Sequence, residues 1–229
     1  MPGCHIEVKK TYLSGNVYHF IYMDSIQPDN AFHGLVYKNP SLAVNVQASL
    51  VVPPGWKALV YKMGMLMDTK DEGTYAFTAQ NFPMLAMMGN LNAAQVEMDV
   101  FFVRSSLSKN KWGTSNPIRL FDNTGGIADV RAFGTYDIKV TDAKRFVSDV
   151  VGFSEFNHET LNGMIKPHIN KLLADVLMKK IETDKVPLQL LSVKTDAVGT
   201  ETREALNNYI GGYGLEITGF TVDNISLPS

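Results

Sequence analysis

The sequence predicts an α+β fold in which a mostly antiparallel, β-rich part precedes an α/β part. Three observations predict it. Apolar and polar residues alternate with a period of two through the first two thirds of the chain, as in half-buried strands. After Asp142 the apolar residues recur at intervals of three and four, as in amphipathic helices. The period changes within one stretch, residues 131–152, which reads RAFGTYDIKVTDAKRFVSDVVG.

Composition and charge restrict the class of protein. The chain has 229 residues, of which 45% are hydrophobic and 19% are charged, enough for one large domain or two small ones. A net charge of -2 without a basic stripe argues against a nucleic-acid partner. Cys4 is the one cysteine, which excludes an internal disulfide and a multi-cysteine metal site. No window approaches the roughly 18–20 apolar residues of a membrane-spanning helix, and residues 1–15 lack the apolar run of a signal peptide.

The first elements are expected to be strands joined by tight turns. Residues 34–52 break at Asn39 and Pro40, and then place residues 42, 44 and 46 on one face of a strand. The sequence PPGW at 53–56 predicts a turn. EGTYAF at 72–77 and QNFPML at 80–85 predict a further turn and strand, and VEMDVFFVR at 96–104 predicts a strand with an apolar end.

Residues 57–68, KALVYKMGMLMD, predict a hairpin that bends near Gly64. Met63, Met65 and Met67 fall on one side of its alternation. Two interpretations of this methionine row stay open. Either the three side chains fill the core, or they form a soft contact surface for a partner or for a second copy of the chain, because methionine adapts to irregular surfaces.

The stretch 131–152 predicts a strand followed by a short helix. Its first half places alternate residues from 132 to 140 on one face of the strand. Thr141 or Asp142 is a suitable helix N-cap, and Gly152 is a suitable residue to close the helix.

Two longer helices and a strand are expected to complete the chain. A core-facing helix begins after Ser154 or Asn157, continues to Ile181 and contains Pro167. A second helix covers about residues 200–209 and ends before the glycines at 211 and 212. Residues 215–228, LEITGFTVDNISLP, predict a last strand.

No constellation of residues predicts a reaction centre. The histidines are scattered, and His158 and His168 would lie about 15 Å apart along a helix, too far to share an ion. The motifs of nucleophile elbows, phosphate loops and dinucleotide sites do not occur. The acidic residues 68, 71 and 72 are expected in a solvated turn, and Asp122 and Asp129 flank the loop sequence NTGG. We therefore expect no catalytic residue, no cofactor, no metal and no enzyme activity.

Five blocks of the sequence, in this order, resemble one known family. They are NVQASLVVPPGWKALVYKMGMLMDTKDEGTYAFTAQNFPML, VEMDVFFVRSS, KWGTSNPIRLFD, VRAFGTYDIKVTDAKRFVSDVVG and YGLEITGFTVDNISLP. From about Phe32 to Pro228 the chain is similar to the SPFH (stomatin/prohibitin/flotillin, band 7) family, and within it to the bacterial virion core protein-like branch. The most specific blocks are WGT-NPI at 112–118, RAFGTYDIKVTD-FV, and the closing YG-EIT-VDNISLP.

The resemblance implies the wedge-shaped, two-part SPFH domain. The expected parts are an N-terminal extension over residues 1–31, a β-rich subdomain over 32–125 and an α/β subdomain over 126–229. The stretch 131–152 would then join the two subdomains and serve as scaffold rather than as a reaction site.

The resemblance also implies a function. Family members are non-enzymatic scaffolds, so we expect a protein that self-associates into homo-oligomers and organises or recruits membrane or envelope proteins. It would be cytoplasmic or peripheral at the inner face of the membrane, reaching membrane proteins or a lipid surface through partners. Met63, Met65 and Met67 are the candidate contact residues. The alternative is a structural subunit of a phage or virion-like particle, which co-purification with particle proteins would distinguish.

Overall fold

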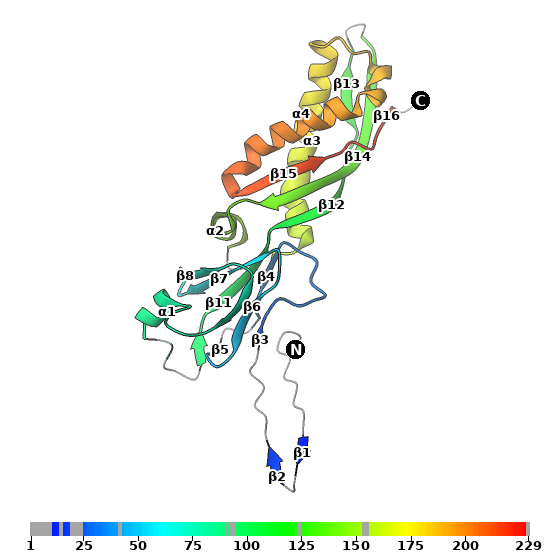
Figure 1. Ribbon diagram of the computed structural model, residues 1–229. Coiled ribbons are helices and arrows are strands. Elements are labelled where there is room, and N and C mark those ends of the chain that lie inside the picture. The colour runs from blue at the N-terminus through cyan, green and yellow to red at the C-terminus, as the bar shows by residue number, and fades with distance from the viewer. Residues whose placement is uncertain are drawn as a thin grey trace. The chain divides into compact units, whose positions relative to one another are not determined.

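The computed structural model describes residues 11–13, 16–18, 25–40, 43–89, 91, 95–122, 125–152 and 156–227. The chain divides into two units, one ending at Arg104 and one beginning at Ser105 (Figure 1). The division therefore falls earlier than the boundary after residue 125 that the resemblance implied. The physical reason is strand pairing, because residues 106–121 hydrogen-bond to the long strand that follows them. The stretch 131–152 consequently lies within the second unit.

The first unit consists of short strands in several small sheets. One sheet has the order β4-β11-β7-β8, another the order β3-β6-β9, and two further pairs are β1-β2 and β5-β10. All pairings are antiparallel except that of β3 with β6. The strands are β1 (Thr11–Leu13), β2 (Asn16–Tyr18), β3 (Ser25–Ile26), β4 (Val36–Lys38), β5 (Ala43–Asn45), β6 (Ser49–Val52), β7 (Trp56–Lys62), β8 (Met65–Lys70), β9 (Gly73–Ala76), β10 (Gln95–Glu97) and β11 (Asp99–Arg104).

The strands from β3 to β11 share one hydrophobic core, which includes Leu50, Val60 and Phe102. The predicted turn at 53–56 is confirmed, since the Trp56 N–H donates to the Pro53 carbonyl over 3.1 Å. The strand predicted after residue 40 corresponds to β5, which pairs with β10. Residue 42, which we placed on one face of this strand, lies outside the described residues. The predicted strand 96–104 is two strands, β10 and β11, rather than one.

The hairpin between β7 and β8 is confirmed, and its geometry explains where its methionines lie. Met63 and Gly64 both have positive φ, 49° and 75°, as in the two-residue turns that match strand twist. Further along, Val60 pairs with Asp68 and Tyr61 pairs with Leu66, so Met67 is an extra residue in β8. Such a bulge shifts the alternation by one residue.

The strand predicted at QNFPML is wrong, because Pro83–Met87 form the short helix α1. Proline fixes the φ angle that the first turn of a helix needs, and Pro83 stands in that turn. Phe82 and Leu85, three residues apart, are both fully buried, which a helical turn allows and a strand does not.

The second unit is built around β14 (Ile127–Val140), a strand of 14 residues. The strands β12 (Ser106–Gly113) and β13 (Ile118–Phe121) pair along one edge of β14. Along the other edge lie β15 (Leu215–Phe220) and β16 (Asn224–Ser226), so the single last strand that we predicted is interrupted at residues 221–223. The even residues of β14 from 130 to 138 are buried, which confirms the predicted alternation.

The predicted change from strand to helix after β14 is also confirmed. Asp142, rather than Thr141, is the N-cap, and its Oδ1 accepts a hydrogen bond from the Arg145 N–H over 2.9 Å. The helix begins as α2 (Ala143–Phe146) and continues as the π-helical turn η2 (Val147–Val151), a widening that the sequence did not predict. Gly152 closes it with a φ of 59°.

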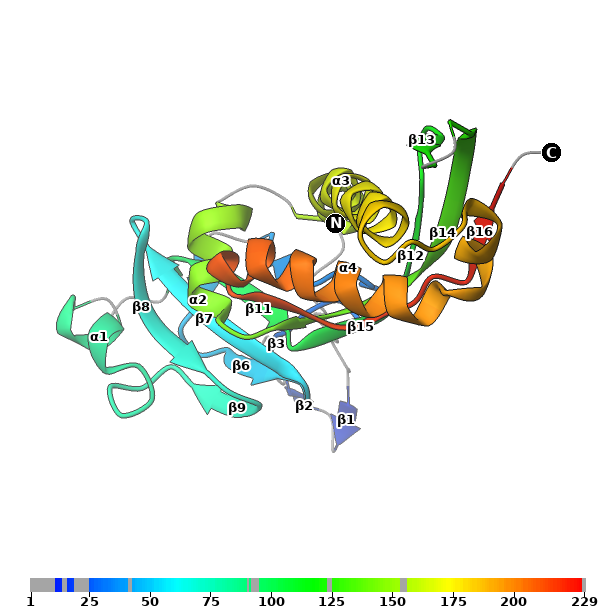
Figure 2. The same ribbon diagram turned by 90° about the horizontal axis from the view of Figure 1, so that it is seen from above.

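The two long helices of the second unit pack against each other and against the sheet (Figures 1 and 2). Asn157 is the N-cap of α3 (His158–Glu182), which contains Pro167 and buries Leu161, Ile165 and Ile169 as predicted. The helix α4 (Thr195–Ile210) begins earlier than predicted and runs beside β15 in both views. The short 3-10 turns η3 (Leu188–Val193) and η4 (Gly211–Tyr213) complete the unit.

Polar side chains link α4 to β15 and to α3. The Asn207 side chain bonds both the N–H and the carbonyl of Ile217, over 2.7 and 3.0 Å, and so covers the open edge of β15. Lys180 of α3, nine-tenths buried, bonds Glu201 of α4 and also bonds Asp184 over 2.7 Å.

Candidate functional site

The sequence singled out Met63, Met65 and Met67, and the structure separates them. Met63 and Met65, at the turn between β7 and β8, are 82% and 54% exposed. Met67 is only 8% exposed and packs in the core of the first unit, where the bulge in β8 turns it inward. Core filling therefore describes Met67, whereas Met63 and Met65 are available for contact.

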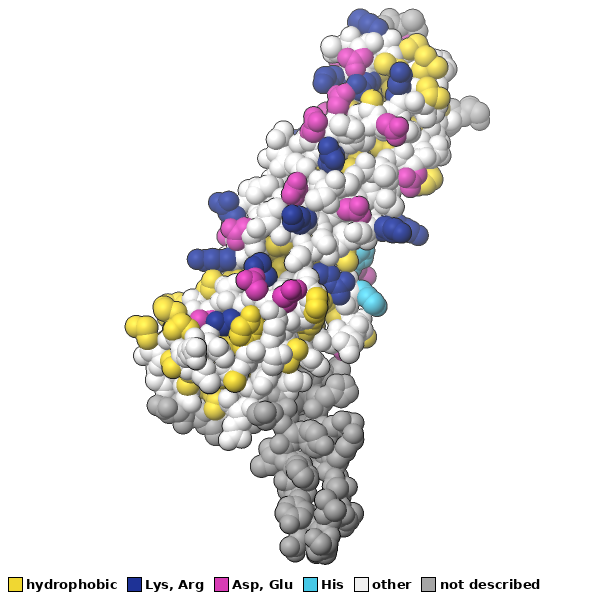
Figure 3. Space-filling model, viewed as in Figure 1, with side chains coloured by type: hydrophobic (Ala, Val, Ile, Leu, Met, Phe, Trp, Pro, Cys, Tyr) yellow, Lys and Arg dark blue, Asp and Glu magenta, His cyan; other side chains and the backbone are white. Residues whose placement is uncertain are grey.

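The helix α1 adds three further exposed methionines: Met84 in its first turn, Met87 at its last position and Met88 directly after it. Because α1 packs against β8, they lie on the same part of the first unit as the hairpin. We call Met63, Met65, Met84, Met87 and Met88 the methionine surface. Figure 3 shows hydrophobic side chains gathered over this part of the unit. Sequence reasoning missed the α1 residues because it assigned them to a strand, although Pro83 was a helix-start signal.

The methionine surface differs in composition from the rest of the molecule. Among the described residues of the first unit, every large hydrophobic side chain that is well exposed is a methionine. The exposed large hydrophobics of the second unit are of other types: Phe121, Ile127, Phe133, Leu190, Val193 and Tyr209. Methionine is unbranched and polarisable, so a surface made of it can adapt to partners of different shape.

Two charged residues of β8 lie beneath the methionine surface. The Lys70 ammonium stands over the ring of Phe82, 4.8 Å from its centroid. The carboxylate of Asp68 is 7% exposed, and its Oδ2 has no hydrogen-bond partner among the described residues. Burial raises the pKa of Asp68, against the smaller opposing effects of Lys70 and the Leu85 N–H. The expectation of a solvated turn is therefore wrong for Asp68.

The other acidic residues that the sequence analysis considered form hydrogen bonds or ion pairs with nearby groups. Asp71 pairs with Lys57, and Glu72 accepts a long hydrogen bond from the Gly55 N–H. Asp122 accepts a hydrogen bond from the Gly126 N–H over 2.6 Å, as expected of the loop it begins. Asp129 forms a two-bond ion pair with Arg119, which lowers the pKa of its carboxyl.

In the residues that the structure describes, no three His, Cys, Asp or Glu side chains are grouped so that they could hold a metal ion. His158 lies at the start of α3, and His168 stacks on Tyr209 with ring centroids 3.8 Å apart. None of the described helices has the length and apolar character to cross a membrane.

The blocks that carried the family resemblance hold the second unit together. Trp112 is buried, stacks on Phe220 at 4.9 Å and donates a hydrogen bond from Nε1 to the Thr221 carbonyl over 3.1 Å. Gly134 lies beneath this contact, because a Cβ there would stand 2.0 Å from the same carbonyl oxygen. The blocks therefore join β12 and β14 to the chain between β15 and β16.

A family model described as SPFH domain-Band 7 family matches residues 36–229. The chain belongs to this family. The match includes almost all of the described residues and agrees with the α+β architecture of the SPFH domain. No curated protein matches the chain. Members of the SPFH family are in general non-enzymatic, membrane-associated scaffolds.

Proposed function

We propose that this SPFH domain is a non-enzymatic scaffold that self-associates and organises or recruits membrane or envelope proteins. Family membership supports the scaffold. The observation that supports self-association is the methionine surface, where five exposed methionines from a hairpin and a helix lie on one part of the first unit. An apolar surface of this kind is typical of a protein contact.

In this proposal Met63 and Met65 touch the partner, while Met67 holds the surface in place from within the core. Lys70 and Asp68 support α1 from below, so the three methionines of α1 are presented on a packed helix rather than on a loop. The neighbouring copy would supply apolar side chains of its own. Attachment to a membrane would follow from the recruited membrane proteins, on the inner face.

The test is the solution mass of the 25.3 kDa chain by size-exclusion chromatography with light scattering over a range of concentrations. We expect a mass above that of the monomer, rising with concentration. The double variant Met63→Ser with Met65→Ser should return the chain to the monomer with an unchanged melting temperature, because both side chains are exposed. The matched control is Val193→Ser, which removes a 70% exposed apolar side chain from the second unit and should change nothing.

A monomer at every concentration would refute self-association by this chain. An oligomer that survives the double variant but dissociates in the Val193→Ser control would move the contact to the second unit. Either result would remove the methionine surface from the proposal.

A further inference from the structure

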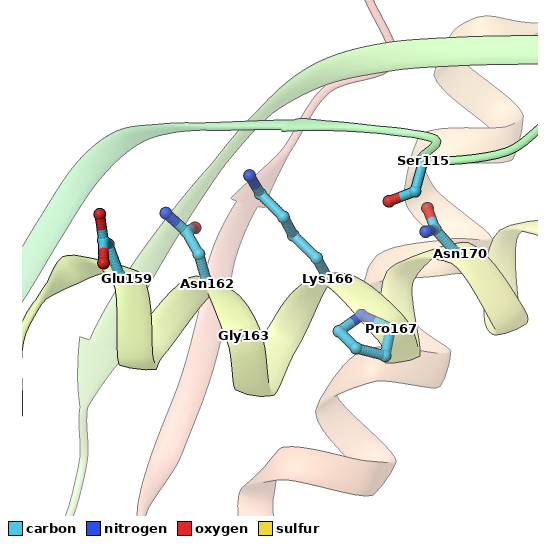
Figure 4. A pocket seen from close by; sticks show the side chains of 7 residues that line it. All are labelled: Ser115, Glu159, Asn162, Gly163, Lys166, Pro167 and Asn170. Carbon is cyan, nitrogen blue, oxygen red and sulfur yellow. The ribbon is translucent and has the colours of Figure 1, made fainter.

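The second unit carries a polar groove that the scaffold proposal does not use. It lies between α3 and the connection from β12 to β13, and its volume is about 520 Å³. This lies within the range of about 300–1,000 Å³ that is usual for ligand sites. Figure 4 shows the side chains that line it. They are Ser115 from the connection and Glu159, Asn162, Gly163, Lys166, Pro167 and Asn170 from α3.

Four polar side chains of α3 form one stripe along the groove. Glu159, Asn162, Lys166 and Asn170 follow one another at intervals of three, four and four residues, which places them on one helix face. Figure 4 shows all four extending from the helix toward the side where Ser115 lies. The stripe is separate from the buried face of α3, which is formed by Leu161, Ile165, Ile169 and the residues after them. Apart from the bond of Asn162 with the Tyr136 hydroxyl, packing of the core does not account for the stripe.

The groove offers hydrogen-bonding groups of both kinds. Asn170 Oδ1 is buried without a hydrogen-bond partner in the described part of the chain. The Asn162 Oδ1 accepts a bond from the Tyr136 hydroxyl over 3.2 Å, which leaves the Asn162 amide N–H groups for another acceptor. Buried polar atoms are normally paired, so an acceptor such as Asn170 Oδ1 gains from a ligand that donates to it.

The backbone of α3 supplies one more acceptor. Pro167 has no N–H, so the carbonyl of Gly163, four residues earlier, lacks its intrahelical partner. Gly163 has no side chain, and a Cβ built there meets nothing within 4 Å. Both residues line the groove, and no side chain covers the backbone at Gly163.

We propose that this groove binds a short extended peptide segment of another protein. A peptide backbone alternates N–H donors with carbonyl acceptors, and the two asparagine amides can pair with both. Glu159 and Asn170 are separated by about 16 Å along the helix axis, the length of roughly five extended residues. Glu159 and Lys166 are separated by about 10 Å, so they match a basic and an acidic side chain roughly three residues apart in the peptide.

The experiment follows the amide signals of the isotope-labelled chain by NMR while blocked pentapeptides are added. The probes are KAAEA and EAAKA, which present the two charges in either order, and SAASA, which has none. We expect one charged peptide to shift the signals of residue 115 and of residues 159–170, with a Kd on the order of 1 mM or below. The uncharged peptide should bind about fivefold more weakly.

Three variants identify the groove as the site. Lys166→Gln and Glu159→Gln should each weaken the charged peptide about fivefold and leave the uncharged one unchanged. Lys171→Gln, an exposed lysine on the same helix outside the groove, is the matched control and should leave all affinities within about twofold. Gly163→Met should abolish binding of every peptide. Its melting temperature should stay the same or rise, because methionine favours a helix more than glycine does and a Cβ at this position has nothing within 4 Å.

The proposal is overturned if no peptide gives saturable shifts at about 5 mM, or if Gly163→Met leaves binding intact. It is also overturned if vesicles of phosphatidylcholine and phosphatidylserine shift the same signals and the peptides do not, since the ligand would then be a lipid headgroup. The inference does not depend on self-association. Gly163→Met should leave the solution mass unchanged, so failure of one proposal is distinguishable from failure of the other.

Discussion

The two units of this SPFH domain bury their apolar side chains in different ways. The second unit relies on long elements, a strand of 14 residues and helices of 25 and 16 residues, whose periodicity is enough to separate buried from exposed faces. In its described residues, the first unit has strands of two to seven residues and an α-helix of five. There the bulge in β8 places Met67 in the core, while Met63 and Met65, at the turn between β7 and β8, stay exposed on the surface.

The two units also expose different kinds of surface. The first unit presents flexible apolar side chains, which suit a contact with a folded partner. The second unit links α3 to α4 and α4 to β15 through polar contacts, and it leaves a polar groove beside α3. Four substitutions test this contrast.

The largest effect is expected in the second unit from Gly134→Ala. The new Cβ would stand 2.0 Å from the Thr221 carbonyl oxygen, so the crossing between β15 and β16 would have to move. We expect a loss of at least about 3 kcal/mol in the free energy of unfolding, measured by urea denaturation. Gly163→Ala is the control, because it has open space and should stabilise α3 by about 0.5–1 kcal/mol. Equal behaviour of the two variants would mean that the Trp112 contact does not depend on Gly134.

Met67→Ala should destabilise the first unit, because the bulge in β8 places the Met67 side chain in its core. It removes a buried side chain, and we expect a loss of about 2–3 kcal/mol in the free energy of unfolding. Met65→Ala, two residues away and 54% exposed, should change stability by less than about 0.5 kcal/mol. Thermal and urea denaturation measure both. Similar losses in the two variants would contradict the separation of the methionine row into core and surface.

Glu201→Gln should weaken the link between α3 and α4 at neutral pH. Its hydrogen bond with Lys180 lowers the pKa of Glu201, so the ionised carboxylate contributes stability above its usual pKa. That contribution is lost as the pH falls through the lowered pKa. We expect the variant to be less stable by about 1 kcal/mol at pH 7 and equal to the unmodified chain in strong acid, as measured by denaturation. Glu204→Gln on the exposed face of α4 should show no such difference.

Asp68→Asn should give the smallest effect, with the opposite dependence on pH. Burial raises the pKa of Asp68, so this residue's contribution is complete below the unfolded value near 4 and is lost as the pH rises through the raised pKa. The variant should therefore gain under about 1 kcal/mol at pH 7 and nothing at pH 3. Asp71→Asn, an exposed neighbour, is the control for the same pH series. A loss of stability at pH 7 would show that the charge of Asp68 holds α1 in place.

Sequence reasoning was most successful where one pattern ran over many residues. The alternation in residues 132–138, the cap at Asp142 and the buried face of α3 were all predicted and are confirmed. Sequence reasoning failed in short segments, where the pattern covered too few residues to distinguish a strand from a helix or an exposed side chain from a buried one. QNFPML looked like a strand but forms α1, and Asp68 looked solvated but lies beneath that helix.

The candidate sites depended even more on tertiary structure. Residues 63, 65 and 67 stood on one side of a regular alternation, and only the extra residue in β8 moved Met67 to the core. The methionines of α1 belong to the methionine surface because this helix packs on β8. No local sequence pattern predicts that contact. The stripe of polar residues on α3 was visible in the sequence, but the chain opposite it, with Ser115, was not.

The sequence by itself determined the α+β class, the order of the long elements and membership of the SPFH family, because periodicity and local turn chemistry are properties of neighbouring residues. The tertiary structure decided where the chain divides, which methionines are exposed and that α3 borders a groove. These depend on pairings between residues far apart, such as β12 and β13 with β14, and a single inserted residue in a strand reverses the face that a side chain occupies.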